Sequence, residues 1–434
     1  MTLFDFPAWM ILPWLFVVGC VVGSFLNVCV HRLPLEERFW HSLFGLVHPP
    51  SRCPRCFNRI PGRFNLPVIG WVMLRGRCYD CKLPISARYP IIEFLNGAVF
   101  VFVYWMEVPL EFGSSLNESS VQTSYSPGSR LFPISIAADV LVNWRFFFHL
   151  ILFEALLVAS LIDIDLKIIP DGCTLPAMLV GFVLSTTLGY VHLTPVWFQV
   201  KNISRELSMV APKWMPLFWI GPEIPHWITN NHHLHGFVYS LAGAVVGGGS
   251  IWALRIIGQW VMRREAMGFG DVVLMAMVGS FIGWQPCLII FFLAPAIASV
   301  VAVACWIFWR EQEVPYGPYL SLATIITVLG WGDIWPYAQR IFALGPILFP
   351  MAVVMLVSLF ALLQLMQGVK WLLGIPLYLE EEWDDEWNSA DQLSHFEGEN
   401  VDLDQGQWRP TSDSRWDGEL SARGQLQEQR WRGR

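Results

Sequence analysis

Two short runs place acidic residues at the edges of long apolar segments, where a carboxylate is costly and commonly functional. Asp163 lies in Leu161-Ile162-Asp163-Ile164-Asp165, at the end of one apolar segment, and Asp271 follows Gly268-Phe269-Gly270 at the start of another. Two carboxylates from different helices can share one proton and activate a water molecule, which is the chemistry of an aspartic protease. Asp163 and Asp271 are therefore the predicted catalytic pair.

Helical geometry separates Asp163 from its neighbour Asp165. Successive residues of an α-helix are rotated by 100°, so these two lie about 200° apart and cannot both face one site. Asp163 is the deeper of the two, so we expect it to be the partner of Asp271. Other interpretations stay open for each residue alone, since Asp271 could cap a helix N-terminus and Asp163 could pair with Lys167 on the same face.

Gly268 and Gly270 flank Phe269, just before Asp271. Glycine adopts backbone geometry that is closed to other residues, and it lets a second backbone approach closely. A protease must hold its substrate in an extended form, so we expect both glycines to support substrate binding.

Four cysteines form two CxxC pairs, Cys53 with Cys56 and Cys78 with Cys81, separated by 21 residues. Two short turns that each present two thiolates supply the tetrahedral ligand set of a structural Zn²⁺ ion. The alternative is a redox pair or four unbound thiols. A second group, His232, His233 and His235, lacks a placed carboxylate, and we expect it to belong to a solvated loop.

The composition indicates a polytopic membrane protein. The chain is 54% hydrophobic and only 15% charged, whereas a soluble domain carries about a quarter charged residues. Its net charge of −7 is concentrated in residues 380–434, which hold 15 acidic residues against 6 arginines. The rest of the chain is close to neutral, so nucleic-acid binding has no electrostatic support.

Apolar stretches near the roughly 20 residues that a bilayer requires predict an all-α fold with about nine transmembrane helices. The stretches are 8–30, 91–110, 146–164, 173–194, 235–258, 272–309, 317–335 and 343–366. The stretch 272–309 is long enough for two helices. We expect the break at Gly283-Trp284-Gln285-Pro286, because proline removes a helix donor.

The charge bias predicts the orientation of these helices. No basic residue precedes the first apolar stretch, so we expect a retained membrane helix there and not a cleaved signal. Ten lysines and arginines lie between Arg32 and Arg88, against three acidic residues, which predicts that this segment is cytoplasmic. Counting spans from it places both Asp163 and Asp271 at the cytoplasmic face.

This count predicts five parts. They are a first transmembrane helix (8–30), a small cytoplasmic zinc-binding domain (33–90), a membrane core (91–335) with outer insertions at 111–144 and 195–231, an additional transmembrane helix (343–366) and an acidic disordered tail (377–434). No feature of the sequence indicates the oligomeric state.

Several short motifs follow one another along residues 8–335. They are Gly23-Ser24-Phe25-Leu26-Asn27-Val28, His31-Arg32-Leu33-Pro34, the CxxC pairs, Leu74-Arg75-Gly76-Arg77-Cys78, the run from Pro84 to Glu93, Ile162-Asp163 with Pro170-Asp171, the run from Glu265 to Asp271, and Tyr316-Gly317-Pro318-Tyr319. In the identity and order of these motifs, the chain resembles the bacterial type IV prepilin peptidases, also called leader peptidase/N-methyltransferases. These are membrane aspartic proteases of the GxGD type.

The resemblance implies a bifunctional enzyme of the bacterial inner membrane. It would cleave prepilins and pseudopilins after the glycine that ends a basic leader, and would then methylate the new N-terminus with S-adenosylmethionine. The family's aspartate pair maps onto Asp163 and Asp271, and its cytoplasmic CxxC domain, to which the resemblance assigns methyl transfer, maps onto residues 33–90. The resemblance names neither the pilin nor the residues that bind the methyl donor, and leaves open whether the enzyme serves a pilus or protein secretion.

The chain departs from the family pattern in its long outer insertions, its ninth span with an acidic tail, and Val272-Val273, where many members have a basic or small polar pair. Two other functions remain. One is a GxGD membrane protease that acts on other substrates without methyl transfer. The other is a transporter whose carboxylates relay protons.

Overall fold

The computed structural model describes residues 8–35, 39–47, 50–53, 56, 58–108, 138–210, 224–262, 267–308, 315–373, 399–401 and 408–410. The chain divides into two compact units. Unit 1 comprises residues 1–106, 154–174 and 383–434, and unit 2 comprises residues 107–153 and 175–382.

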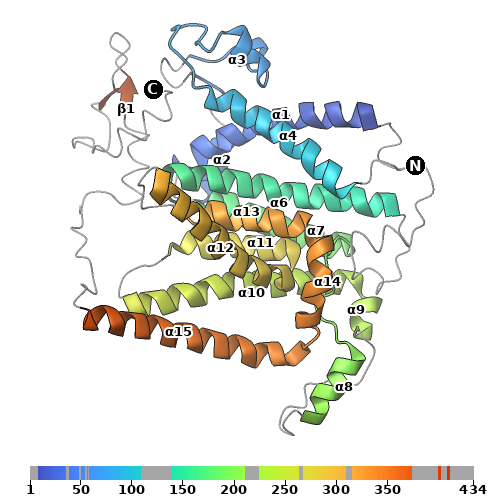
Figure 1. Ribbon diagram of the computed structural model, residues 1–434. Helices are drawn as coiled ribbons and strands as arrows, with labels where there is room; N and C mark the ends of the chain where they lie inside the picture. The colour runs from blue at the N-terminus through green and yellow to red at the C-terminus, as the bar shows by residue number, and fades with distance from the viewer. Residues whose placement is uncertain are drawn as a thin grey trace. The chain divides into compact units, whose positions relative to one another are not determined.

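Helices that can cross a membrane dominate both units (Figure 1). Seven are long and apolar enough: α1 (Ala8–Arg32), α4 (Arg88–Glu107), α6 (Ala138–Leu166), α7 (Asp171–Leu188), α10 (His232–Met262), α12 (Trp284–Phe308) and α15 (Leu348–Leu372). Two shorter apolar helices, α11 (Phe269–Ile282) and α13 (Gly317–Leu329), accompany them. The predicted all-α membrane fold is confirmed, and the count of about nine helices agrees with seven long and two short ones.

In unit 1, α1 and α4 lie side by side because glycines remove the side chains between them (Figure 1). A Cβ atom at Gly19 would lie 2.8 Å from the Cα atom of Gly97, and one at Gly23 would lie 2.9 Å from the Cα atom of Glu93. The Asn96 side chain donates a hydrogen bond to the Gly19 carbonyl at 3.0 Å. This close packing holds the start of α4 against the end of α1.

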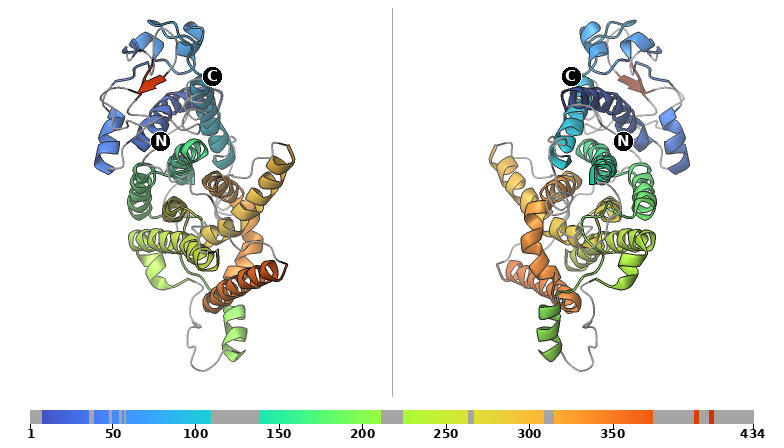
Figure 2. Two further views of the ribbon diagram at one scale, coloured as in Figure 1. Left: turned by 90° about the vertical axis from the view of Figure 1, so that its left-hand side faces the viewer. Right: turned by 90° about the vertical axis from the view of Figure 1, so that its right-hand side faces the viewer.

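Short elements connect α1 to α4. They are η1 (Leu33–Leu35), α2 (Phe39–Val47), η2 (Gly62–Phe64) and α3 (Ile69–Met73). Figure 2 shows from two opposite directions that α3 and its neighbouring turns lie on one side of the α1–α4 pair. The segment therefore forms a small module beside these two helices.

In unit 2, the close packing of α10 and α11 depends on small residues. A Cβ atom at Gly243 would clash with the carbonyl oxygen of Gly279, and one at Gly247 would lie 2.6 Å from the carbonyl oxygen of Met275. The two backbones are therefore in contact, so α10 fixes the position of α11. The predicted break is also confirmed, since α11 ends at Ile282 and Gly283 has a φ of +77°.

The remaining elements of unit 2 refine the predicted boundaries. The predicted span 317–335 is two helices, because α13 stops at Leu329 and α14 (Trp331–Phe342) follows. α14 buries Trp331 and Trp335 while Tyr337 is exposed, so it is amphipathic. The short elements η4 (Gly345–Ile347), α8 (Lys201–Val210) and α9 (His226–Asn230) complete the unit.

The outer insertions and the tail are described only in part. Residues 111–137 of the first insertion and residues 211–223 of the second lie outside the described residues. In the acidic tail, the described residues form only a short antiparallel pair, β1 (Glu399–Val401) with β2 (Trp408–Pro410). The predicted disorder of the rest of the tail stays a prediction.

Candidate functional site

Asp163 belongs to unit 1 and lies in the last turn of α6. Its residue is only 5% exposed. The helix ends because Lys167 adopts a left-handed φ of +57°, and the Lys167 N–H donates to the Asp163 carbonyl at 2.9 Å. The Asp163 carboxyl group is therefore attached near the carbonyl end of a helix, where the helix dipole disfavours negative charge.

Asp165 has a partner of its own in unit 1. Its two carboxylate oxygens face the two terminal nitrogens of Arg88, at 2.9 Å and 2.6 Å. The first contact is a charge-assisted hydrogen bond and the second is at ion-pair distance, so the pair is stronger than one between neutral groups. Arg88 is the first residue of α4, so the pair ties the start of that helix to the end of α6, two residues beyond Asp163.

Asp271 belongs to unit 2 and is the third residue of α11. Gly268 is the N-cap and makes no side-chain cap bond, so the alternative in which Asp271 caps the helix is wrong. The helix begins at Phe269, two residues earlier than expected, because the Gly268 backbone is already extended. Asp271 is 8% exposed and lies where free backbone N–H groups favour a negative charge.

The glycines before Asp271 provide space and not unusual geometry. Gly268 has a φ of −66°, which any residue adopts, so the expected need for glycine-only backbone geometry is wrong at this position. A Cβ atom at Gly268 would have no neighbouring atom closer than 3.9 Å. The space beside its Cα atom is open, which is what the close approach of a second backbone requires.

An arginine on α10 holds the segment that leads to Asp271. The Arg255 Nε–H donates to the Met267 carbonyl at 3.0 Å, and the guanidinium lies 5.7 Å from the centre of the Phe269 ring. Met267 directly precedes the N-cap Gly268. Arg255 therefore fixes both sides of the glycine turn within unit 2.

Tyr316 is a further residue of this neighbourhood, and our sequence reasoning gave it no role. It directly precedes α13, and burial together with the nearby Asp271 carboxylate raises the pKa of its hydroxyl to about 12. Its oxygen is buried and makes no hydrogen bond with any described residue. The motif Tyr316-Gly317-Pro318-Tyr319 was the available signal, but only the folded chain brings it close to Asp271.

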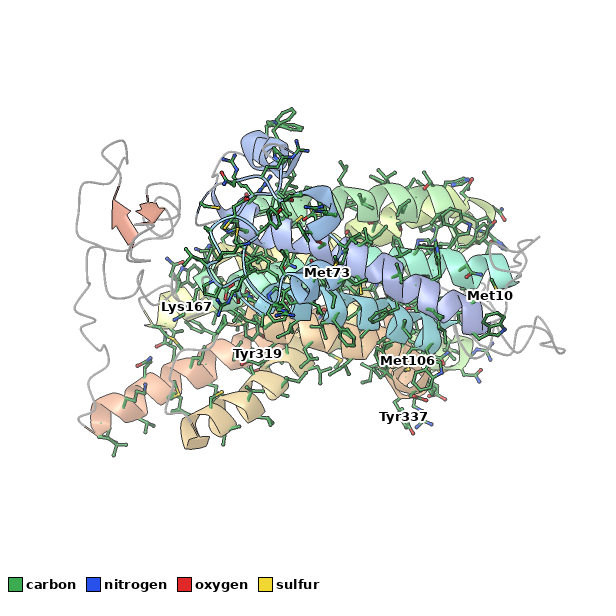
Figure 3. All side chains as sticks on the ribbon, turned by 90° about the horizontal axis from the view of Figure 1, so that it is seen from above. Met10, Met73, Met106, Lys167, Tyr319 and Tyr337 are labelled. Carbon is green, nitrogen blue, oxygen red and sulfur yellow. The ribbon has the colours of Figure 1, made fainter. Side chains whose placement is uncertain are left out.

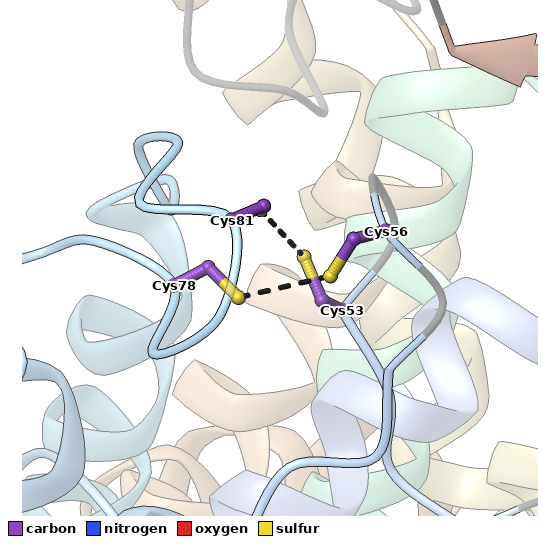
Figure 4. A group of neighbouring side chains, drawn as sticks. All are labelled: Cys53, Cys56, Cys78 and Cys81. Carbon is purple, nitrogen blue, oxygen red and sulfur yellow. Dashed lines mark hydrogen bonds between the residues drawn. The ribbon is translucent and has the colours of Figure 1, made fainter. Parts of the chain in front are cut away.

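The four cysteines of the CxxC pairs converge in unit 1 (Figure 4). The Sγ atoms lie within 4.8 Å of one another, with Cys53 to Cys81 at 4.0 Å and Cys56 to Cys78 at 3.9 Å. A tetrahedral zinc ion with Zn–S bonds of about 2.3 Å separates its sulfurs by about 3.8 Å. The cluster therefore has the ligand set and the spacing that could hold a metal ion.

Backbone amides prepare this cluster for thiolates. Burial opposes ionisation of Cys78, but backbone N–H groups of Cys81 and Asp80, together with the Cys81 and Cys53 side chains, lower the pKa of the Cys78 thiol, whereas burial raises the pKa of Cys81. Two small hairpins present the cysteines, with paired backbones at Arg52–Arg59 and at Arg77–Pro84. Such amide-supported turns are typical of structural zinc knuckles.

The histidines at the start of α10 do not form a second ligand cluster. Among the described residues, the four cysteines are the only group of three or more potential ligands close enough to share an ion. His235 is fully buried, and its Nε2 accepts the Val196 N–H at 3.0 Å. Our expectation of a solvated loop is therefore wrong for His235, which fastens the chain after α7 to α10.

Comparison with known proteins identifies the family. Residues 17–107 match the Bacterial Peptidase A24 N-terminal domain, and residues 208–303 match the Type IV leader peptidase family. A prepilin leader peptidase/N-methyltransferase of Pseudomonas putida is 31% identical over 335 residues, which are 73% of this chain and 89% of the relative. The chain belongs to this family.

Two further relatives with the same name support the assignment of this chain to the type IV leader peptidase family. The protein of Stutzerimonas stutzeri is 28% identical over 73% of this chain and 89% of its own length. The protein of Aeromonas hydrophila is 26% identical over 74% of this chain and 93% of its own length. No solved structure matches the chain.

The family matches cover the site residues unequally. The N-terminal match includes the cysteine cluster and Arg88, and the second match includes Asp271 and Arg255. Asp163 lies between the two matched segments, and Tyr316 lies after them. The roles of these two residues in this family member therefore rest on their own surroundings.

Proposed function

We propose that this protein is a membrane aspartic endopeptidase that removes the leader of type IV prepilins or pseudopilins after a glycine, and then methylates the new N-terminal amine. The observation that carries the proposal is the match, over 73% of the chain, to relatives named prepilin leader peptidase/N-methyltransferase. The buried carboxylates at helix ends supply residues suited to the cleavage.

Asp163 and Asp271 form the proposed catalytic pair and share one proton. Asp271 lies at a helix N-terminus, which stabilises its ionised form, so it accepts a proton from the attacking water. Asp163 lies at a helix C-terminus, which stabilises its neutral form, so it donates a hydrogen bond to the scissile carbonyl. The hydroxide adds to that carbonyl carbon, and collapse of the tetrahedral intermediate breaks the C–N bond as the leaving amine takes up a proton.

The methyl transfer is assigned to residues 33–90. The new pilin amine attacks the methyl group of S-adenosylmethionine, a C–N bond forms as the C–S bond breaks, and S-adenosylhomocysteine leaves while the amine loses a proton. The assignment rests on the resemblance to the leader peptidase/N-methyltransferases, whose cytoplasmic CxxC domain maps onto these residues. The substrate and the methyl donor are partners proposed through the relatives' names.

Zinc is the proposed occupant of the cysteine cluster, with a structural role because four thiolates leave no coordination site open for water. Replacing Cys53 and Cys78 by serine should abolish bound zinc and unfold the module between α1 and α4. Elemental analysis of the purified protein measures this directly. Serine substitution of Cys20, which lies on α1, is the matched control and should leave the metal content unchanged.

The apolar helices make this a multi-pass membrane protein. We assign it to the bacterial inner membrane with the proposed catalytic pair at the cytoplasmic face. The ten basic residues between Arg32 and Arg88 favour this orientation.

The decisive experiment mixes the purified, reconstituted protein with a prepilin and S-adenosylmethionine and reads the product by intact mass. We expect a pilin that has lost its leader up to the glycine and gained one methyl group. A cleaved but unmethylated product under saturating donor would support a GxGD protease without methyl transfer. An unprocessed prepilin, with the protein folded and zinc-loaded, would overturn the proposal.

A further inference from the structure

The short helix α3 presents an apolar face to its surroundings. Ile69, Val72 and Met73 recur at the spacing of one helix side, and Leu66 lies just before the helix. All four side chains are large, apolar and between 50% and 61% exposed. We refer to Leu66, Ile69, Val72 and Met73 as the α3 face. A contiguous exposed apolar surface of this kind marks a binding or membrane-contact site.

The opposite side of α3 is fixed to unit 1, so the α3 face cannot rotate inward. The Trp71 indole donates to the Ile85 carbonyl at 3.1 Å. A Cβ atom at Gly70 would clash with the Phe64 carbonyl oxygen, so the helix backbone packs directly on the preceding turn. The Val68 N–H donates to the Glu93 carboxylate on α4 at 2.6 Å. These contacts therefore fix the orientation of α3 and keep the α3 face exposed.

The module that carries α3 is tethered to the membrane at both ends. It begins where α1 ends at Arg32 and finishes where α4 begins at Arg88, and both helices are candidate spans. Figure 3 shows Met73 between Lys167, just after α6, and Met106, near the far end of α4, along the direction of these helices. The α3 face thus lies beside the membrane helices of unit 1 and not beyond their ends.

The polar surroundings of the α3 face are strongly basic. Arg63, Arg75, Arg77 and Lys82 are exposed on the same module. Asp80 is the one acidic residue between positions 58 and 88. An apolar face on a segment rich in exposed basic side chains has the composition of a segment that lies in a membrane interface and attracts anionic headgroups.

We propose that the α3 face inserts into the lipid leaflet at the surface where α1 ends and α4 begins, while Arg63, Arg75, Arg77 and Lys82 contact anionic lipid headgroups. The charge pattern favours lipid over a protein substrate, because a basic leader would be repelled by this rim. Insertion holds the zinc module against the bilayer, next to the ends of α1, α4 and α6. Only the exclusion of a prepilin leader rests on the proposed enzymatic function.

Photo-crosslinking of the full-length protein in nanodiscs tests the insertion. The photoreactive residue p-benzoylphenylalanine replaces Val72 in one variant and Asn58, an exposed residue of the first hairpin, in the control. Nanodiscs of mixed phosphatidylglycerol and phosphatidylcholine supply the lipid, and equal zinc content shows that both variants are folded. We expect lipid adducts at position 72 to exceed those at position 58 by about tenfold or more.

Two results would overturn the insertion. One is an equal yield of lipid adducts at the two positions. The other is a lack of lipid adducts at position 72 combined with crosslinks to prepilin when that substrate is added, which would make the α3 face a substrate surface. A prepilin crosslink that leaves the lipid adducts unchanged supports insertion, because the lipid then remains the occupant.

A second arm tests the role of the basic rim. In the position-72 background, replacing Arg75 and Arg77 by glutamine should lower the lipid-adduct yield several-fold in nanodiscs with phosphatidylglycerol. In nanodiscs of phosphatidylcholine alone, the same replacements should change nothing, because neutral headgroups give no net attraction. Equal yields with and without the arginines in both lipids would overturn the headgroup contact.

Discussion

Asp163 and Asp271 are both buried aspartates at helix ends, yet their surroundings differ in kind. Asp163 lies in the last turn of α6 in unit 1, and Arg88 forms an ion pair with its neighbour Asp165. Asp271 begins α11 in unit 2, and its arginine, Arg255, donates to a neutral backbone carbonyl. One neighbourhood is held by opposite charges and the other by backbone hydrogen bonding.

This difference bears on how two identical side chains divide their tasks. A helix N-terminus stabilises a carboxylate, and a helix C-terminus disfavours one, each by roughly 0.3–1 kcal/mol for exposed groups and more where water is excluded. In the proposed mechanism, this asymmetry assigns the role of base to Asp271 and the role of proton-bearing partner to Asp163. Variants that change one side at a time can therefore break or sharpen the comparison.

The largest expected effect follows from replacing either aspartate by asparagine. Asparagine at 271 cannot accept a proton, so cleavage should fall by about 10⁴-fold, whereas asparagine at 163 can still donate a hydrogen bond and should cost about 10²–10³-fold. Single-turnover cleavage of a prepilin measures both. Asp333→Asn, at an exposed site on α14, is the control and should keep full activity. A larger loss at 163 than at 271 would reverse the assignment of roles.

The next effect concerns the ion pair in unit 1. Arg88→Met leaves the Asp165 carboxylate, whose side chain is 2% exposed, without its counter-charge. We expect the free energy of unfolding to fall by about 2–4 kcal/mol. Cleavage should also fall, by about tenfold, because the end of α6 that carries Asp163 loses its attachment to α4.

A double-mutant cycle separates the pair from its surroundings. Asp165→Asn alone should cost less than Arg88→Met, because Arg88 is 21% exposed and can remain partly hydrated. The double variant should recover part of the loss, with a coupling energy of about 1–3 kcal/mol. Strictly additive losses would show that the ion pair does not hold this helix end.

Replacing Tyr316 in unit 2 should have a smaller effect, which lowers cleavage without lowering thermal stability. Its buried hydroxyl makes no hydrogen bond with described residues, so Tyr316→Phe should leave the thermal stability unchanged or slightly raised. Cleavage should nevertheless fall by about tenfold, because the bound substrate loses this hydroxyl as a hydrogen-bond donor. Parallel melting curves and kcat values measure the two effects, and a loss of both together would reduce Tyr316 to a packing role.

The raised pKa of Tyr316, about 12, sets the pH behaviour of this hydroxyl. An ordinary tyrosine ionises near pH 10, so between about pH 10 and 12 the unfolded chain releases this proton first, and the contribution of Tyr316 to stability is lost there as the pH rises. Below pH 10 the hydroxyl stays a donor in both states. The effect of Tyr316→Phe on cleavage should therefore be constant between pH 6 and 9.

The sequence predicts those parts of the molecule that depend on local chemistry. Hydropathy predicts the spans, glycine followed by proline predicts the break before α12, and the CxxC spacing predicts the cysteine cluster. Local signals also mislead, because glycine and aspartate are both good N-caps, and only the observed backbone shows that Gly268 takes this position. The division of 317–335 into α13 and α14 was also missed, because Trp331, Ile334 and Trp335 at the start of the amphipathic α14 were counted with the apolar stretch of α13.

Contacts between residues that are distant in the sequence could not be predicted from it. Arg88 and Asp165 are 77 residues apart, and nothing near either residue announces the pair. Tyr316 lies 45 positions after Asp271, so their proximity depends on how α11 and α13 pack. The candidate aspartates could be picked out from the cost of a carboxylate in a membrane, whereas the residues that contact their surroundings are determined by tertiary structure.

The smallest expected effect belongs to Arg255, the counterpart of Arg88. Its acceptor is the neutral Met267 carbonyl, so Arg255→Met removes a hydrogen bond without leaving a buried charge behind. We expect a stability loss of about 1 kcal/mol and a fall in cleavage of about three- to tenfold from a looser glycine turn. Arg340→Met, on the exposed side of α14, is the matched control and should change neither quantity.

The conservative variant Arg255→Lys decides whether Arg255 acts by position or by bulk. A lysine can reach the same carbonyl but lacks the planar group that stacks on Phe269, so it should restore kcat in part while KM stays constant. For a residue that only fills space, Lys and Met should be equally impaired and melt together. An Arg255→Met loss as severe as that of Arg88→Met would show that the two neighbourhoods are held by comparable forces, and the contrast between a charged and an uncharged support would fail.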